Sequence, residues 1–367
     1  MAISRSVIKH ISMAKLAIKL FLVITGAVLA MLILEVYQRL NQSSYHIPIE
    51  CYRMDDILNH TLIPQKTCQF KTSEWNISYK INSLGLRDKE RSLEKPANTF
   101  RILMLGDSFT EGWGINQDKT FGAILEKRLN ETSKSLNFEV INAGVSAYSP
   151  ILEYLYLKNK GLNFKPDLVI LNFDPNDFAD DQGFAQFAKF DQDGIPLAVS
   201  PKLPEVYRLG QEISNKLNEH ELVLGDLKPN PIYYFLAKHS FLLRQVLFTQ
   251  LIRPNVPTTE ATSIQWAQTG KNLLLTKALL EKANIQFLVT IYPYQIHLKN
   301  PSLNTFSKLS EFGRENNLKV LNLFGDFAKD KPQSYYFKRD IHGNQKFHNT
   351  VAQSIYRYLV QNQLVAD

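Results

Sequence analysis

The sequence predicts an α/β protein, a three-layer α/β/α sandwich around a mainly parallel five-stranded sheet, with one transmembrane helix at the N-terminus. Three observations lead to this prediction. From Phe100 onward, short apolar runs alternate with longer segments of helical length. The short runs are almost continuously hydrophobic, as expected for parallel strands covered on both faces. A further uncharged apolar run lies close to the start of the chain.

The apolar run near the N-terminus predicts a membrane segment. It is LFLVITGAVLAMLIL, Leu20–Leu34, and with its flanking residues it reaches about the length that a helix needs to span a membrane. We expect a cytoplasmic N-terminus over residues 1–19 and an anchor over residues 20–38. A cleaved signal peptide is the alternative, with Val28 and Ala30 marking the processing site. The apolar run continues beyond these two residues, which favours an uncleaved anchor.

The charges around this run predict its orientation. Four basic residues precede it, and the first acidic residue, Glu35, follows it. Because basic residues stay on the cytoplasmic side, we expect the rest of the chain outside the cytoplasm, in a periplasmic or extracellular space. The net charge is +7, but apart from these four residues the 42 basic and 35 acidic residues nearly balance. The small remaining excess of basic residues is scattered along the chain, which argues against a nucleic-acid partner.

Residues 39–98 form a leader between the anchor and the first predicted strand of the sheet, and their pattern is irregular. The clearest turn in it is INSLGLRDKE, residues 81–90. Both cysteines of the chain, Cys51 and Cys68, lie in this leader. On the expected oxidising side of the membrane a disulfide between them is favoured, with two free thiols as the alternative.

Residues 99–367 are expected to form one domain. Its strands are expected in five apolar runs, at residues 101–105, 139–143, 167–173, 286–292 and 319–324. Segments of helical length and periodicity are residues 120–131, 150–161, 263–282 and 303–316. Such a series of strand, helix and strand builds a parallel sheet with right-handed crossovers. Functional residues then gather at the carboxyl ends of the strands.

A long insertion, residues 178–262, interrupts the alternation between the third and fourth strands. Within it, Asp193 and Gly194 stand between apolar residues and predict a hairpin over residues 189–199. The very apolar residues 233–252 predict a helix. That helix is either a covered core helix or a lid over a site.

The first strand ends in Gly-Asp-Ser, which places Ser108 at its carboxyl end. A serine hydroxyl becomes a nucleophile only when a base takes its proton. Asp340 and His342 stand two positions apart before the last predicted helix, and in an extended segment such positions project to the same side. We therefore expect His342 to act as the base and Asp340 to orient it.

Three hydrogen-bond donors are candidates for stabilising the anion that such an attack creates. They are the N–H of Ser108, the N–H of Gly144 in INAGVSAYS and the side-chain amide of Asn176 in FDPNDFADD. Each follows a predicted strand. No group of metal-ligating residues has a convincing spacing, so we expect no metal and no other cofactor.

In this order, the Gly-Asp-Ser, Asn-Ala-Gly, Asn-Asp and Asp-x-His motifs resemble the four blocks of the SGNH (GDSL-type) hydrolase family. The resemblance covers roughly residues 99–361, and the leader's NSLGLRD is similar to a stretch in membrane-anchored bacterial members. It implies a flavodoxin-like fold. It also implies Ser108 as nucleophile and first oxyanion donor, Gly144 and Asn176 as further donors, and His342 with Asp340 as the catalytic pair.

Two features depart from the family pattern. Asp174 and Pro175 precede Asn176, where the family commonly has a glycine two positions before the asparagine. Asp340 and His342 are separated by one residue, whereas many members have two. The shorter spacing is similar to that of alginate-type O-acetyltransferases.

The resemblance implies an extracytoplasmic serine esterase that cleaves an acyl or acetyl ester through an acyl-enzyme on Ser108. The expected location points to an ester carried by an envelope glycan or lipid. An O-acyltransferase acting on an envelope polysaccharide is one alternative, because it uses the same first half-reaction. A non-catalytic envelope-assembly or binding protein is another.

Overall fold

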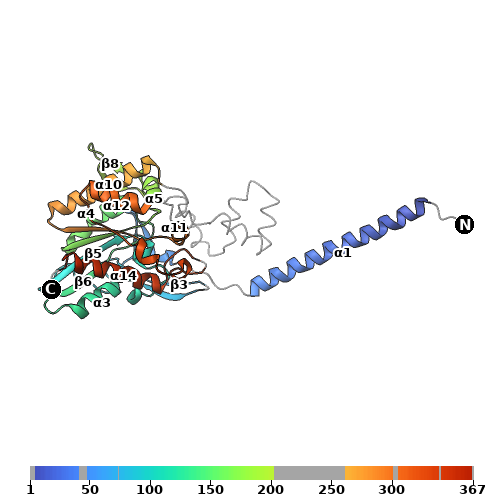
Figure 1. Ribbon diagram of the computed structural model, residues 1–367, viewed down its shortest axis with the longest axis horizontal. Helices are drawn as coiled ribbons and strands as arrows, with labels where there is room; N and C mark the ends of the chain where they lie inside the picture. Colours follow the sequence, from blue (N-terminus) through green and yellow to red (C-terminus); the bar gives the residue numbers. More distant parts are fainter. Residues whose placement is uncertain are drawn as a thin grey trace. The chain divides into compact units, whose positions relative to one another are not determined.

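The computed structural model describes residues 5–40, 48–72, 74–201, 261–300, 305–338 and 340–365. They fall into two units (Figure 1). Helix α1 (Arg5–Leu40) belongs to the first unit, and the remaining elements named below belong to the second.

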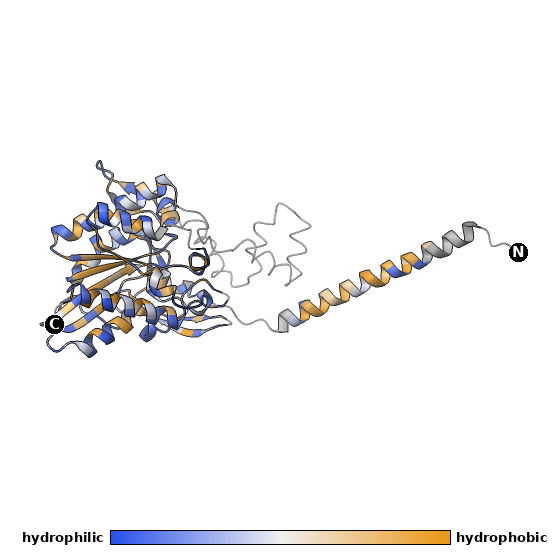
Figure 2. Cartoon of the chain, in the orientation of Figure 1, coloured by the Kyte–Doolittle hydropathy of each residue, from blue (hydrophilic) through white to orange (hydrophobic). Residues whose placement is uncertain are grey.

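Helix α1 has the length and composition of a membrane segment. Its stretch Lys15–Tyr37 has 23 residues with a mean hydropathy of 2.6, and none of it is buried. The hydrophobic colouring runs along most of the helix (Figure 2). A single helix of this kind near the N-terminus suits either a membrane span or a signal sequence.

A five-stranded sheet forms the centre of the second unit, in the order β11-β10-β7-β5-β6. The strands are β5 (Thr99–Gly106), β6 (Asn137–Asn142), β7 (Leu168–Phe173), β10 (Gln286–Ile291) and β11 (Val320–Asn322). Every pairing in it is parallel. The chain passes from β5 to β6 on one side and then to β7 on the other, so the strand order reverses at β5. The carboxyl end of β5 is therefore the switch point at which such sheets place their sites.

Helices cover both faces of the sheet, which confirms the predicted α/β/α sandwich (Figure 1). They are α3 (Phe121–Thr132), α4 (Pro150–Asn159), α10 (Ser263–Lys282), α12 (Thr305–Glu315) and α14 (Gln345–Gln361). Side chains of β5 alternate between two apolar clusters because successive residues of a strand face opposite sides. Leu103 packs in one cluster with α4, α10 and α12, and Met104 packs in the other with α3 and α14.

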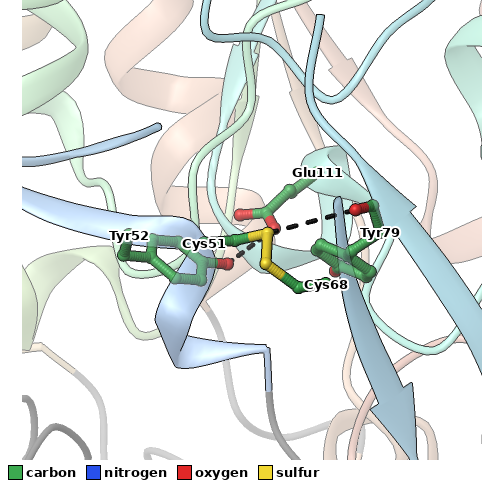
Figure 3. The surroundings of a disulfide bond; sticks show 5 residues. All are labelled: Cys51, Tyr52, Cys68, Tyr79 and Glu111. Carbon is green, nitrogen blue, oxygen red and sulfur yellow. Dashed lines mark hydrogen bonds between the residues drawn. A yellow bond between two sulfur atoms is a disulfide. The ribbon is translucent and has the colours of Figure 1, made fainter. Parts of the chain in front are cut away.

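The leader is ordered, so the expectation of an irregular stretch was wrong for its described part. It forms two antiparallel hairpins. Their strands are β1 (Tyr52–Asp55), β2 (Asn59–Leu62), β3 (Thr67–Lys71) and β4 (Asn76–Lys80). A disulfide joins Cys51 at the start of the first hairpin to Cys68 in the second (Figure 3). Both cysteines are buried within the same apolar cluster as Leu103.

The described part of the insertion contains the predicted hairpin. It is formed by β8 (Ala188–Phe190) and β9 (Pro196–Val199), which pair antiparallel. Gly194 has a φ of 69° in the connecting turn, a conformation that favours glycine. The predicted apolar helix over residues 233–252 lies outside the described residues.

The shorter elements connect this framework. They are η1 (Ile49–Cys51), α2 (Ser108–Glu111), η2 (Gln117–Lys119), η3 (Gly161–Phe164), α5 (Asp177–Ala185), α11 (Gln295–Lys299), α13 (Phe324–Phe327) and η4 (Pro332–Ser334). Two of them closely follow central strands: α2 begins at Ser108, after β5 has ended at Gly106, and α5 begins at Asp177, after β7 has ended at Phe173.

Candidate active site

Ser108 is the first residue of α2, and only Asp107 separates it from the end of β5. Gly106 has a φ of 151°, and a Cβ there would lie 2.1 Å from Thr110 Oγ1, so only glycine fits. Asp107 caps the helix, its carboxylate accepting from the Phe109 N–H at 2.9 Å. Each residue of the Gly-Asp-Ser motif thus has its own role. Gly106 allows the backbone to pack closely, Asp107 caps the helix, and Ser108 presents a partly exposed hydroxyl.

The structure brings Ser108, His342 and Asp340 together. Ser108 Oγ lies 2.7 Å from His342 Nε2. The other ring nitrogen, Nδ1, lies 2.5 Å from Asp340 Oδ1, which also accepts from the His342 N–H at 2.9 Å. The one-residue spacing therefore suits an Asp–His pair. Although burial acts in the opposite direction, the charge of His342 and its hydrogen bonds hold the pKa of Asp340 below its usual range.

Neighbouring rings and the backbone fix the position of His342. Its imidazole stacks on Trp113 with centroids 5.3 Å apart, and it contacts Phe109 at 4.8 Å. The loop carrying it is closed by a hydrogen bond from the Phe337 N–H to the His342 carbonyl, 3.1 Å long. The side chain of Asn344 then caps α14. The imidazole is therefore held in place from two sides.

The three expected anion donors differ in how free they are. Ser108 is the first residue of α2, and helix geometry provides no acceptor for its N–H. The N–H of Gly144 is occupied, because it donates to Asn142 Oδ1 at 3.0 Å. Asn176 donates one amide hydrogen to Asp180 at 2.8 Å and accepts from the Tyr294 hydroxyl at 2.7 Å. Its second amide hydrogen has no such bond among the described residues.

Gly144 has a steric role in this structure. A Cβ there would lie 2.4 Å from the Glu111 nitrogen and 2.7 Å from the carbonyl carbon of Thr110. Glycine therefore lets the loop after β6 lie directly against α2. The expectation that its N–H serves Ser108 does not fit the hydrogen bond that this N–H makes.

Ala147 in the same loop has a backbone N–H that the sequence argument did not consider. Its φ is 59°, a left-handed conformation that is uncommon for alanine. The neighbouring amides of Val145, Ser146 and Tyr148 all donate to acceptors within the structure. The Ala147 N–H makes no such bond within the described residues, and Ala147 is partly exposed among buried neighbours. Alanine gives no sequence signal for such a backbone conformation.

Comparison with known proteins gives a family match over part of the chain. The GDSL-like lipase/acylhydrolase family matches residues 104–240, a range that contains Ser108, Gly144 and Asn176. The chain carries a GDSL-like lipase/acylhydrolase domain. This result confirms the family resemblance and the expectation of an ester-hydrolysing enzyme. The curated proteins contain no match to the chain.

Several solved structures are similar to the chain. One is a GDSL-like lipase from Bacteroides thetaiotaomicron, with 14% identity, a TM-score of 0.37, and coverage of 71% of this chain and 88% of that chain. Another is a catalytic mutant of the acetylxylan esterase Axe2 from Geobacillus stearothermophilus, with 12% identity, a TM-score of 0.39, and coverage of 70% and 93%. A third is TesA, with 12% identity, a TM-score of 0.41, and coverage of 71% and 97%.

Several buried carboxyl groups lie near Ser108 in the described part of the chain. Asp107, Asp174, Asp177 and Glu153 are all buried. Burial, followed by the charge of Asp107, raises the pKa of Asp174 well above its usual range. Burial, followed by the charge of Glu153, raises the pKa of Asp177 in the same way. Burial and mutual repulsion therefore shift these carboxyl groups toward their neutral forms.

Replacing Asp174 with asparagine should raise the stability of the protein at alkaline pH. In the folded protein Asp174 keeps its proton, whereas in the unfolded chain it releases this proton above about pH 4. The free energy of unfolding therefore decreases as the pH rises from about 4 toward the raised pKa. Asparagine cannot ionise. We expect the gain in unfolding free energy to be larger at pH 8 than at pH 4.5, by on the order of 1–3 kcal/mol, in urea titrations.

Asp326→Asn is the control for this prediction and should behave in the opposite way. Although burial acts against it, hydrogen bonds from Lys329, Ser354 and Arg357 lower the pKa of Asp326 to about 2. Its contribution is present above about pH 4 and is lost as the pH falls toward 2. The variant should therefore lose stability at neutral pH. Equal pH dependence in wild type and Asp174→Asn would contradict the expectation for Asp174.

Proposed function

We propose that the chain is a membrane-anchored serine esterase that acts outside the cytoplasm. It cleaves acyl or acetyl esters on an envelope glycan or lipid through an acyl-enzyme on Ser108. The observation that carries the proposal is the 2.7 Å contact between Ser108 Oγ and His342 Nε2, with Asp340 on the far side of the imidazole. This distance is within the reach that proton transfer requires.

The reaction has two halves. His342 Nε2 takes the Ser108 proton while Oγ bonds to the ester carbonyl carbon, and Asp340 stabilises the resulting imidazolium. His342 then gives the proton to the leaving alcohol oxygen as the carbon–oxygen bond breaks, which leaves the acyl group on Ser108. Water repeats the sequence, with His342 as base, and releases the carboxylic acid.

We assign the oxyanion donors as the N–H of Ser108, the N–H of Ala147 and the free amide hydrogen of Asn176. Ala147 takes the place that the sequence analysis gave to Gly144, because the Gly144 N–H is already bonded to Asn142. Each such donor is worth about 100- to 1,000-fold in turnover. The buried Asp174 is compatible with an anion site because its raised pKa favours the neutral form.

The proposed location is supported by helix α1 and by the disulfide. The apolar stretch Lys15–Tyr37 is long enough to anchor the chain, and the basic residues before it favour a cytoplasmic N-terminus. A disulfide between Cys51 and Cys68 suits an oxidising compartment. We propose residues 20–38 as the anchor, 39–98 as a leader and 99–367 as the hydrolase domain.

The proposal is tested with the full-length chain in detergent micelles. Wild type should hydrolyse p-nitrophenyl acetate, butyrate or octanoate, and Ser108→Ala should lower kcat by at least ~10³-fold. Adding an oligosaccharide acceptor measures transfer against hydrolysis, so faster transfer would identify an O-acyltransferase instead. Wild type no faster than Ser108→Ala on every ester would favour the non-catalytic binding protein.

A further inference from the structure

Glu111 is a buried charged residue that the reaction above does not use. It is the last residue of α2, three positions after Ser108, and it is 0% exposed. Its Oε2 accepts from the Ser146 N–H at 2.5 Å, and its Oε1 accepts from the Tyr52 hydroxyl at 2.6 Å. Ser146 directly precedes Ala147. One carboxylate therefore joins the nucleophile helix, the loop with the proposed second donor, and the leader.

Arg87 holds the same end of α2. Its guanidinium is 0% exposed and Nη1 donates to the carbonyls of Glu111 and Gly112, each at 2.7 Å. Nη2 donates to the carbonyl of Ile115. The guanidinium also lies 3.8 Å from the centroid of the Tyr79 ring. A cation thus binds carbonyls at the C-terminal end of the helix, where the helix dipole favours it. Arg87 belongs to the NSLGLRD motif of the leader.

Tyr52 follows Cys51, so the disulfide fixes the strand that presents its hydroxyl to Glu111 (Figure 3). The Tyr52 hydroxyl also lies 3.1 Å from Ser146 Oγ. Tyr52 therefore contacts both Glu111 and Ser146, and the hydrogen bond between these two residues connects α2 to the loop after β6. The family match begins only at residue 104, so these leader contacts come from outside it.

We propose that Glu111 is a positioning residue that fixes the Ala147 loop relative to Ser108, and that Tyr52 and Arg87 of the leader hold Glu111 in place. The leader thereby completes the catalytic site. The inference rests on the proposed function for its effect on turnover. A displacement of a few tenths of an ångström in a donor weakens its bond to the oxyanion, so loss of this support lowers kcat more than it raises KM.

Tyr52→Phe tests this positioning role, because it removes the hydroxyl and keeps the ring. Tyr156→Phe is the matched control. Tyr156 is a buried tyrosine of α4 whose hydroxyl makes no hydrogen bond among the described residues. We expect Tyr52→Phe to lower kcat on a p-nitrophenyl ester by about tenfold, the effect of one hydrogen bond to a charged group. KM should stay within about twofold, and the Tm should match that of Tyr156→Phe.

The double variant Tyr52→Phe/Glu111→Gln sharpens the test. Glutamine has one acceptor oxygen where glutamate has two, so it cannot accept from the Tyr52 hydroxyl and from the Ser146 N–H on separate oxygens as Glu111 does. If the two side chains act through one another, the double variant should lose little more kcat than Glu111→Gln alone. Multiplicative losses would overturn the proposed coupling. A kcat for Tyr52→Phe equal to that of Tyr156→Phe, or a loss explained by the unfolded fraction at the assay temperature, would overturn the positioning role.

A second readout separates this inference from the proposed function. A fluorophosphonate probe reacts with an activated serine whatever the natural substrate, and its labelling of Ser108 depends on the same anion donors. If wild type is labelled but hydrolyses no ester, the esterase proposal fails and the tenfold slower labelling of Tyr52→Phe still supports the inference. If wild type is neither labelled nor active, both proposals fall.

Discussion

Replacing His342 with alanine is expected to lower kcat by at least ~10⁴-fold while leaving the fold intact. Without the imidazole, the one described group left within hydrogen-bond distance of Ser108 Oγ that could take its proton is the buried Asp107 carboxyl at 3.4 Å, whose pKa is raised by burial. His342 is only partly buried, with 14% of its side chain exposed. Its removal should therefore cost about 1 kcal/mol of unfolding free energy, measured by urea titration beside the kinetic assay.

His348→Gln is the control for the choice of base. His348 is 1% exposed in α14, and its Nδ1 accepts from the Phe121 N–H at 3.2 Å. Burial lowers the pKa of His348 to about 3, so it is a neutral structural group at physiological pH. We expect its variant to affect stability and to keep kcat within an order of magnitude. Activity lost in His348→Gln but retained in His342→Ala would contradict the assignment.

The central sheet could be predicted from the sequence because its strands are covered on both faces. Leu168–Phe173 is buried along its whole length, and its run of apolar residues is interrupted only by Asn172. The leader strands carry a weaker signal. Thr67–Lys71 and Asn76–Lys80 alternate exposed and buried residues over only five positions each. Such short alternation is easily missed without the partner strand that completes it.

Residue chemistry predicted the side chains of the site better than its backbone. A hydroxyl, a carboxylate and an imidazole, in this order along the chain of a parallel-sheet protein, are required by few other functions. Ser108, Asp340 and His342 supply them. Which backbone amide is free depends instead on tertiary hydrogen bonds. Asn142 occupies the Gly144 N–H, and the left-handed conformation of Ala147 leaves no trace in its residue type.

The leader's support of the site was hidden for a different reason. Charged residues such as Arg87 and Glu111 are usually solvated, and nothing local in the sequence distinguishes a buried one. Arg87 is buried because three carbonyls of the turn after Ser108 converge on its guanidinium. A charged motif that flanks a catalytic domain can therefore be buried and hold the backbone of that domain in place, as well as form an exposed linker.

Replacing Asp340 with asparagine should lower kcat by roughly 10²- to 10⁴-fold with little change in KM. Asp340 Oδ1 receives both the ring N–H and the backbone N–H of His342. Asparagine can still accept these bonds, but it carries no negative charge to stabilise the imidazolium that forms as Ser108 attacks. The measurement is kcat and KM for the same p-nitrophenyl ester from pH 5 to pH 9.

Asp330→Asn is the matched control for Asp340→Asn, since Asp330 is an exposed carboxylate that pairs with Lys346 at 2.8 Å. It should keep kcat because an exposed ion pair contributes little. The stability of Asp340→Asn gives a second check. With the folded pKa of Asp340 held low, its contribution is present above about pH 4 and is lost as the pH falls toward that lowered pKa, so the difference in stability between wild type and variant should shrink on acidification. A kcat equal to that of Asp330→Asn would mean that stacking on Phe109 and Trp113 alone orients the imidazole.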